Sequence, residues 1–292
     1  MRLRLLVSAL LLALLTGCST IKVAYNQAEF IAAWMADDYF DLNGEQKDAF
    51  RAHFQRFHAW HRATQLLQYA ALLEAAQKRL DTGVSAADAT WLVGSVKTQY
   101  RTIVLRGYAD AARLLSTLSD QQLVAARRQF EEVNRKYARE FGVGAAPDEQ
   151  RRLLAKRQLE RVEHWTGPLS AAQEARIAEM SRALPRVTDL RHQDRMRRQQ
   201  EFLTLLAERK QLNTFAPKLR EWLLDWDRTR TTDYDAALAR FAEASAKMYV
   251  DAYTLLTAEQ RHHIASRLQR YVAAFRELAQ DTARTVAEEK RG

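Results

Sequence analysis

Residues that break helices are scarce in this chain of 292 residues, which holds nine Gly and four Pro. Glycine weakens a helix through its backbone entropy, and proline does so because it lacks an N–H group. Apolar residues recur with helical spacing, and no segment of useful length alternates as a strand does. The sequence therefore predicts an all-α fold, an elongated multi-helix bundle. We expect helices at 21–39, 44–80, 85–117, 120–141, 148–165, 171–212, 215–228, 232–255 and 258–289, with Pro185 kinking or breaking the sixth.

The first eighteen residues have the pattern of a secretion signal. Two arginines precede an apolar run over residues 5–15, which is too short to span a bilayer, since about 20 apolar residues are needed. The run ends in the tetrapeptide LTGC, which resembles the bacterial lipobox and contains the single cysteine of the chain, Cys18. The resemblance implies cleavage between Gly17 and Cys18 and a diacylglyceryl thioether on Cys18. Because Ser19 and not Asp follows, it also implies an outer-membrane location that faces the periplasm.

One short pattern occurs four times, as LNGEQ at 42–46, LSDQQ at 118–122, LSAAQ at 169–173 and LTAEQ at 256–260. Each copy is a predicted capping box, in which the Asn, Ser or Thr side chain accepts a hydrogen bond from the N3 backbone N–H. The Gln side chain reaches back to the N–H of the capping residue. Segments 108–115 and 249–256 also share five of eight residues. We interpret this as an internal duplication, and chance similarity of two Ala- and Leu-rich helices is the alternative.

The duplication suggests how the chain is organised. The first predicted helix follows a short tether, and it either packs into the core or contacts the bilayer. We assign a signal peptide to 1–17, the lipid anchor, tether and first helix to 18–41, one helical repeat unit to 42–141, a linker helix to 142–168 and a second repeat unit to 169–292.

The repeated pattern resembles the LTxxQ motif of Spy and CpxP, small all-helical periplasmic proteins, most closely at Leu256–Gln260 and Leu169–Gln173. With its lipobox, the whole chain also resembles an uncharacterised family of Gram-negative lipoproteins. The resemblance to Spy implies chaperone activity without ATP, through a basic and partly apolar concave surface. This chain is about twice as long as Spy and has Asn43 where the motif has Ser or Thr, so only the motifs and nearby helices carry the resemblance.

No motif of an enzyme or a cofactor site occurs: G-x-S-x-G, H-E-x-x-H, a P-loop and a dinucleotide-binding glycine pattern are all absent from the sequence. His53, His58 and His61 share one predicted helix without a carboxylate in the cluster, so we interpret them as helix-surface residues beside aromatic rings and predict no metal site. Asp110 and Asp251 occupy matching positions in the duplication, and we expect them to accept structural hydrogen bonds or salt bridges. We predict a protein that is not an enzyme and that has no cofactor.

Basic residues, which give the chain a net charge of +9, are concentrated in two predicted helices. The second contains our candidate surface for an anionic partner, made of Arg186, Arg191, Arg195, Arg197 and Arg198. One interpretation is a solvated helix face with ion pairs, and the other is a site for lipid headgroups, lipopolysaccharide phosphates or acidic unfolded clients. Nucleic acid suits the charge but not the predicted compartment.

The sequence thus favours a non-enzymatic envelope protein that Cys18 anchors to the membrane and that binds protein clients in the manner of a chaperone. The alternative is a structural or assembly lipoprotein of the outer membrane with one specific protein partner or an anionic lipid as its ligand.

Overall fold

The computed structural model describes the backbone of residues 21–289 and the side chains up to residue 281. The described residues form helices and no strand, which confirms the predicted all-α fold. The predicted signal peptide, Gly17 and Cys18 lie outside the described residues. Residues 21–26 are helical, and the helices that follow are α2 (Ala28–Phe40), α3 (Gly44–Trp60), a π-helical turn (His61–Gln65), α4 (Leu66–Thr82), α5 (Ala86–Ser116), α6 (Asp120–Phe141), α7 (Pro147–Thr166), α8 (Ala171–Arg182), α9 (Thr188–Ala207), α10 (Leu212–Leu224), α11 (Thr232–Thr254) and α12 (Ala258–Glu289).

The predicted helix over 171–212 is the one that differs most from the structure. It breaks beside Pro185 into α8 and α9, which is one of the two outcomes that we expected. Its predicted end was wrong, because α9 stops at Ala207 and a new helix begins at Leu212. No Gly or Pro marks this stop. Arg209 follows α9, and its guanidinium donates to the carbonyls of Leu206 (3.1 Å) and Leu118 (2.8 Å), so contacts with a distant loop fix the end of the helix.

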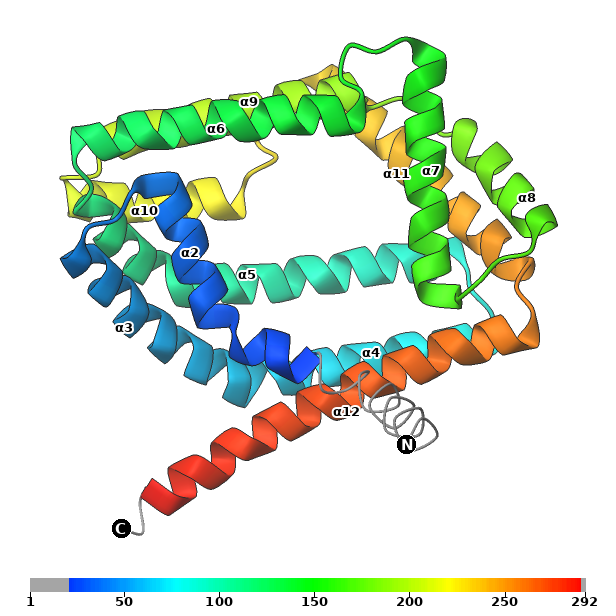
Figure 1. Cartoon of the computed structure of the whole chain (residues 1–292), viewed down its shortest axis with the longest axis horizontal. Helices are drawn as coiled ribbons and strands as arrows, with labels where there is room; N and C mark the ends of the chain where they lie inside the picture. The colour runs from blue at the N-terminus through cyan, green and yellow to red at the C-terminus, as the bar shows by residue number, and fades with distance from the viewer. Residues whose placement is uncertain (1–20, 290–292) are drawn as a thin grey trace, which may run out of the picture.

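The helices lie around the periphery of the molecule as a closed frame (Figure 1). Helices α6 and α9 run side by side along one edge, α7, α8 and α11 form the next, and α4 with α12 forms a third. Helix α5 contacts α3 and α10 near one end of its path and α4 and α11 near the other. The segments 42–141 and 169–292 are therefore interleaved, since α4 packs against α12, α5 against α10 and α6 against α9.

The main cluster of buried apolar side chains holds together the part of the frame where α5, α9 and α10 meet. Leu118, Leu206, Phe215 and Leu219 are at most 2 % exposed there, and Phe40 of α2 packs against them. Burying an aliphatic or aromatic side chain of this size contributes about 1.5–3 kcal/mol, so this cluster is a strong tether between distant segments. Within residues 21–289, no helix is both long and apolar enough to cross a membrane.

All four predicted capping boxes form. Asn43, Ser119 and Ser170 each accept from the N3 backbone N–H, and Thr257 does so at the start of α12. In every copy the Gln side chain accepts from the backbone N–H of the capping residue. Ser85 starts α5 with a further capping box that the sequence analysis missed.

The four glutamines of these boxes also meet in two pairs. Gln46 Nε2 donates to Gln122 Oε1 (3.1 Å), and Gln122 Nε2 donates back to Gln46 Oε1 (2.6 Å). Gln173 and Gln260 exchange the same two bonds at 2.8 and 3.0 Å. Each amide also donates to the backbone carbonyl just before the Leu of its partner's motif, at Thr117, Asp41, Leu255 and Pro168. The motif therefore joins the starts of two helices, in addition to capping each of them.

Candidate functional site

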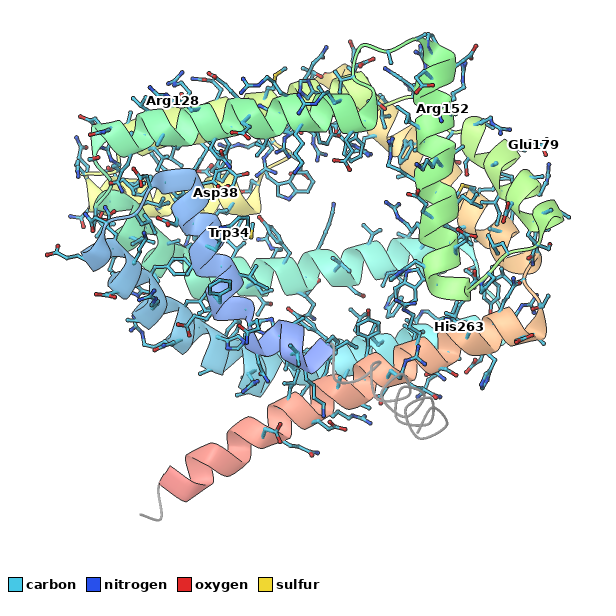
Figure 2. All side chains as sticks on the ribbon, viewed as in Figure 1. Trp34, Asp38, Arg128, Arg152, Glu179 and His263 are labelled. Carbon is cyan, nitrogen blue, oxygen red and sulfur yellow. The ribbon has the colours of Figure 1, made fainter. Side chains whose placement is uncertain are left out.

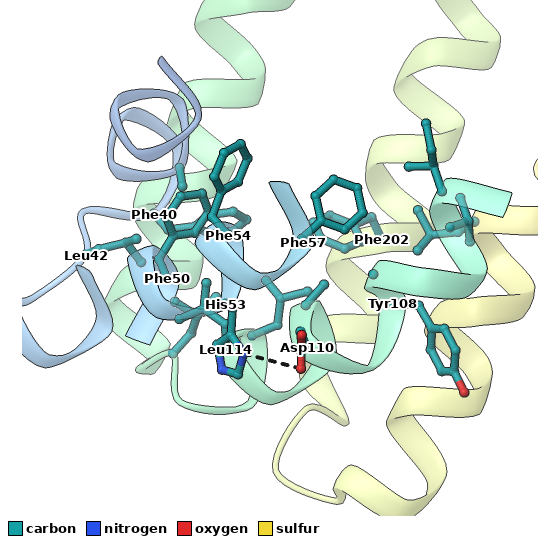
Figure 3. Close-up of a pocket in the computed structure, with 18 residues that line it drawn as sticks. Phe40, Leu42, Phe50, His53, Phe54, Phe57, Tyr108, Asp110, Leu114 and Phe202 are labelled. Carbon is teal, nitrogen blue, oxygen red and sulfur yellow. Dashed lines mark ion pairs between the residues drawn. The ribbon is translucent and has the colours of Figure 1, made fainter. Parts of the chain in front are cut away.

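An apolar pocket of about 440 Å³ lies between α2, α3, α5 and the region where α9 meets α10 (Figure 3). Its wall is rich in aromatic rings. Phe50, Phe54 and Phe57 lie three or four residues apart and so share one face of α3, while Phe40 comes from α2 and Phe202 from α9. This volume is within the range of ordinary small-molecule sites. We call this site the apolar pocket.

A single charged pair interrupts the wall of the apolar pocket. His53 Nδ1 of α3 lies 3.3 Å from Asp110 Oδ1 of α5, and Asp110 also pairs with Arg113 (Figure 3). Partial burial raises the pKa of Asp110, but the hydrogen bond from Arg113 and the positive charges of His53, Arg113 and Arg56 outweigh this effect, so the net pKa is lowered. Asp110 thus links two helices, as predicted.

A second pocket, of about 520 Å³, adjoins the apolar pocket, and Phe40 and Phe202 line both. Three cationic side chains of α9, those of Arg191, Arg195 and Arg198, line this second pocket, which we call the arginine pocket. Its wall is completed by Tyr39, Phe130, Asp194, Gln199 and Trp222. The two pockets therefore lie side by side, one with a mainly apolar wall and the other with three arginines, and we call the two together the joined pockets.

Each of these three arginines lies over an aromatic ring. The guanidinium carbon is 5.2 Å from the ring centre of Phe241 for Arg191, 5.3 Å from Tyr137 for Arg195 and 4.9 Å from Trp222 for Arg198. Within the described part of the chain, no carboxylate oxygen lies within 4.0 Å of any of the three. Stacking helps to place all three guanidinium groups, and Arg195 Nε also donates to Asn134 Oδ1 (2.9 Å), but no ion pair within the described chain neutralises their charges.

Asp194 is the one acidic residue that lines the arginine pocket, and its ion pairs are with arginines that do not line it. It pairs with Arg197 at 2.6 Å and approaches Arg230 at 4.0 Å. Arg197 also pairs with Glu201, at 2.6 Å. The described lining of the arginine pocket therefore keeps the positive charge of its three arginines.

The candidate anionic-partner residues do not form one surface. Arg191, Arg195 and Arg198 are spaced i, i+4 and i+7, so they share one face of α9 and meet in the arginine pocket. Arg197 points to Asp194 and Glu201 instead, and Arg186 is exposed before the start of α9 and lines neither pocket. Three of the five residues are thus brought together, half-buried, in the wall of one open pocket.

Two donors at the arginine pocket have no hydrogen-bond partner among the described residues, Arg198 Nε and Trp222 Nε1. Burial lowers the pKa of Arg198, while the negative charges of Asp194 and Glu201 act against this. A buried donor without a partner costs about 1–3 kcal/mol. These two donors are therefore available to hydrogen-bond with a group that enters the pocket.

Helix α2 presents apolar side chains to solvent beside the apolar pocket. Phe30 is 70 % and Trp34 62 % exposed, and Ile31 and Met35 are exposed next to them. None of the thirteen residues of α2 is buried, and Figure 2 shows Trp34 and Asp38 along this helix. This stripe, which we call the α2 stripe, follows closely after the predicted anchor, whereas Phe40 at the end of α2 contacts the core and lines both pockets.

A histidine cluster at the π-helical turn is a second polar site. The ring nitrogens of His61 lie 2.8 Å from Tyr25 Oη and 3.2 Å from Tyr69 Oη, and burial lowers the pKa of His61 to about 4. His58 stacks on Phe54, as predicted, but His53, His58 and His61 are all half-buried, so the prediction of all three as helix-surface residues was wrong. His61 is the first residue of the π-helical turn His61–Gln65. The described residues contain no group of His, Cys, Asp and Glu that could hold a metal ion.

The fold and the site define an all-α protein whose helices surround a joined apolar and cationic site. Residues 38–235, more than half of the chain, match the DUF6279 family, a family of unknown function, and the chain belongs to it. That match covers the whole lining of the arginine pocket and all of the apolar pocket except Ala36. No curated protein and no solved structure matches the chain.

Proposed function

We propose that this chain is a lipid-anchored, non-enzymatic protein of the cell envelope that binds an amphipathic partner in the joined pockets. Cys18 carries the anchor in this proposal and holds the protein at the outer membrane, facing the periplasm. The observation that carries the binding function is the sharing of Phe40 and Phe202 between an apolar pocket and a pocket with three arginines.

The chemistry of the walls favours binding over catalysis. Among the described residues that line the apolar pocket, none is Ser, Thr or Cys, so the His53–Asp110 pair has no nucleophile beside it to activate. The arginines of the second pocket are always charged and cannot act as general bases at neutral pH. Both sets of residues suit a ligand that is held without being altered.

The α2 stripe supports a position at the membrane. Tryptophan is favoured at the boundary between lipid and water, and apolar rings such as Phe insert just below it; Trp34 and Phe30 are exposed on α2, close after the predicted anchor. The stripe would lie in the headgroup region once the acyl chains on Cys18 are inserted. A bilayer contact at α2 would also place the apolar pocket next to the membrane surface.

A chaperone-like function is the second candidate, and the α2 stripe favours it. An exposed apolar patch can contact unfolded segments of other proteins, and the LTxxQ-like motifs agree with a chaperone of the Spy type. The two functions differ in breadth. A chaperone suppresses the aggregation of two unrelated clients in a light-scattering assay, whereas a protein that binds only in its pockets suppresses neither.

A fluorescent probe with an aromatic body and one sulfonate, anilinonaphthalene sulfonate, tests the proposed binding. We expect saturable binding at one probe per chain, weaker in Arg195→Gln and in Ala111→Phe, which fills part of the apolar pocket from α5. Arg127→Gln removes the same charge from an exposed position of α6 and serves as the matched control. Binding that none of these changes affects, or no binding at all, contradicts the proposal. The anchor is tested separately by the release of Cys18→Ser from the membrane fraction.

A further inference from the structure

We infer that the ligand of the joined pockets is an anionic lipid, with its acyl chain in the apolar pocket and its headgroup against Arg191, Arg195 and Arg198. The inference rests on the proposed binding function and names the class of ligand. Three features of the described residues carry it: the composition of the apolar wall, the three arginines without a carboxylate partner and the place of α2 beside the site.

The apolar pocket suits a hydrocarbon chain better than a peptide. Of the eighteen residues that line it, only His53, Tyr108 and Asp110 have polar side chains, and Asp110 is already paired with His53 and Arg113. A peptide would bring backbone N–H and C=O groups that need partners throughout their length, and this wall offers almost none. An acyl chain needs no such partners and gains from the burial of its methylene groups.

The arginine pocket suits a phosphate or carboxylate headgroup. Three guanidinium groups face it from successive turns of α9, and none of them has a carboxylate partner within 4.0 Å in the described chain. Guanidinium groups bind phosphate and carboxylate through two parallel hydrogen bonds, which are stronger than bonds between neutral groups. A zwitterionic headgroup would bring its own cation into the same pocket and lose much of this attraction.

The membrane is the source of ligand that the geometry favours, over free phosphate in the periplasm. Ala36 and Phe40 of α2 line the apolar pocket, and the same helix carries the α2 stripe in the preceding turns. By helical spacing, Ala36 and Phe40 lie on the face of α2 opposite the α2 stripe, and an α-helix is about 10–12 Å across. A lipid that leaves the bilayer at the stripe therefore has to pass around this one helix to reach the apolar pocket. Free phosphate would use only the arginine pocket and would leave the aromatic wall without a ligand.

The test uses the mature chain from residue 18 onward with Cys18→Ser, so that no anchor competes for the site. Binding is measured by calorimetry below the micelle concentration with palmitoyl lysophosphatidylglycerol, palmitoyl lysophosphatidylcholine and glycerol phosphate. We expect one lysophosphatidylglycerol per chain, bound at least tenfold more tightly than either of the other two. Arg195→Gln should weaken it about tenfold, since one charged hydrogen-bonding group is lost. Ala111→Phe should weaken both lysolipids alike.

Two control variants keep the result specific. Arg127→Gln makes the same charge change outside both pockets, and Val93→Phe adds an aromatic ring at an exposed position of α5, the helix that holds Ala111. Neither should change the affinity. Circular dichroism of every variant confirms that the helices are intact.

Each contrary outcome identifies what has failed. Equal affinity for the two lysolipids overturns the role of the arginines, and equal affinity for glycerol phosphate and lysophosphatidylglycerol overturns the role of the apolar pocket. Binding of anilinonaphthalene sulfonate in the joined pockets without binding of either lysolipid overturns the lipid inference and leaves the proposed function in place. Binding of neither probe removes both.

Discussion

Replacement of Gln46 by alanine tests whether the paired capping boxes join helices or only start them. Gln46 is buried, with only 5 % of its surface exposed. Its Oε1 accepts from Asn43 N–H (3.1 Å) and from Gln122 Nε2 (2.6 Å), and its Nε2 donates to the carbonyl of Thr117 (3.2 Å) and to Gln122 Oε1 (3.1 Å). One of these bonds is local, and the others cross to a helix that begins more than seventy residues later.

The loss of stability that we expect in Gln46→Ala follows from these contacts. A hydrogen bond within a protein contributes about 1 kcal/mol, and Gln122 keeps its bonds to Asp41 and Ser119 when Gln46 is removed. Counting the crossing bonds that have no replacement, we expect Gln46→Ala to lower the free energy of unfolding by about 2–3 kcal/mol. If the motif only capped its own helix, the loss would be about 0.5–1 kcal/mol. The two accounts therefore differ by an amount that can be measured.

Urea unfolding followed by circular dichroism measures this difference, with Gln121→Ala as the control, because Gln121 is the exposed neighbour of Gln122. A double-mutant cycle with Gln122→Ala separates the two accounts more sharply. We expect a coupling energy of about 1–2 kcal/mol between Gln46 and Gln122, since they share two hydrogen bonds. A coupling energy near zero, with a small loss for Gln46→Ala, would refute the reasoning.

Four further perturbations test other parts of the structure. Gly94→Ala should raise the melting temperature, because alanine favours an exposed helix interior by up to about 1 kcal/mol. Gly142→Ala should lower the free energy of unfolding by at least about 1 kcal/mol, because Gly142 has φ +67° and the new Cβ would lie 2.6 Å from a methyl group of Leu153. The free energy of unfolding of the wild type should fall as the pH is lowered from about 6.5 to 4, and His61→Phe should make this fall smaller. Only the unfolded state of the wild type binds a proton on His61 in that window, as urea midpoints at pH 7 and pH 5 can show. Arg209→Leu should lower the free energy of unfolding by about 1–3 kcal/mol, because the carbonyl of Leu206 at the end of α9 and that of Leu118 in the loop before α6 lose a buried donor. An unchanged urea midpoint would contradict this.

The sequence predicted the helix starts well because a capping box is complete within four residues. Asn43 and Gln46, for example, bond to each other's backbone N–H, so no distant segment is needed to recognise the motif. The pairing of Gln46 with Gln122 depends on contacts across 76 positions, and nothing local indicates it. The end of α9 was missed for the same reason, since Arg209 ends the helix through a carbonyl of the loop before α6.

Of the candidate site, only Arg191, Arg195 and Arg198 were named as site residues from the sequence, and neither the aromatic wall nor the geometry was predicted. The arginines of α9 were recognised by their density, but density alone cannot separate the face of Arg191, Arg195 and Arg198 from Arg197. One local signal was available. Positions 191, 195, 198 and 202 follow one helical stripe, and the last of them is Phe202, which packs against the core. A stripe of arginines that continues into a core aromatic residue indicates partial burial, whereas isolated surface arginines do not.

Partial burial of Arg198 leads to a prediction about the empty protein. Its guanidinium is held between Trp222 and Trp226, its Nε has no partner in the described chain, and burial lowers its pKa. Replacement of a buried charge by an apolar side chain of similar length is often neutral or stabilising. We therefore expect Arg198→Met to leave the urea midpoint of the empty protein unchanged or higher. The same change should abolish most of the rise in midpoint that lysophosphatidylglycerol causes in the wild type, because that rise depends on binding to the folded state alone. A lower midpoint without ligand, together with an undiminished rise with ligand, would mean that Arg198 supports the fold by stacking and takes no part in the site. Stability and binding would then have to be assigned to different residues of α9.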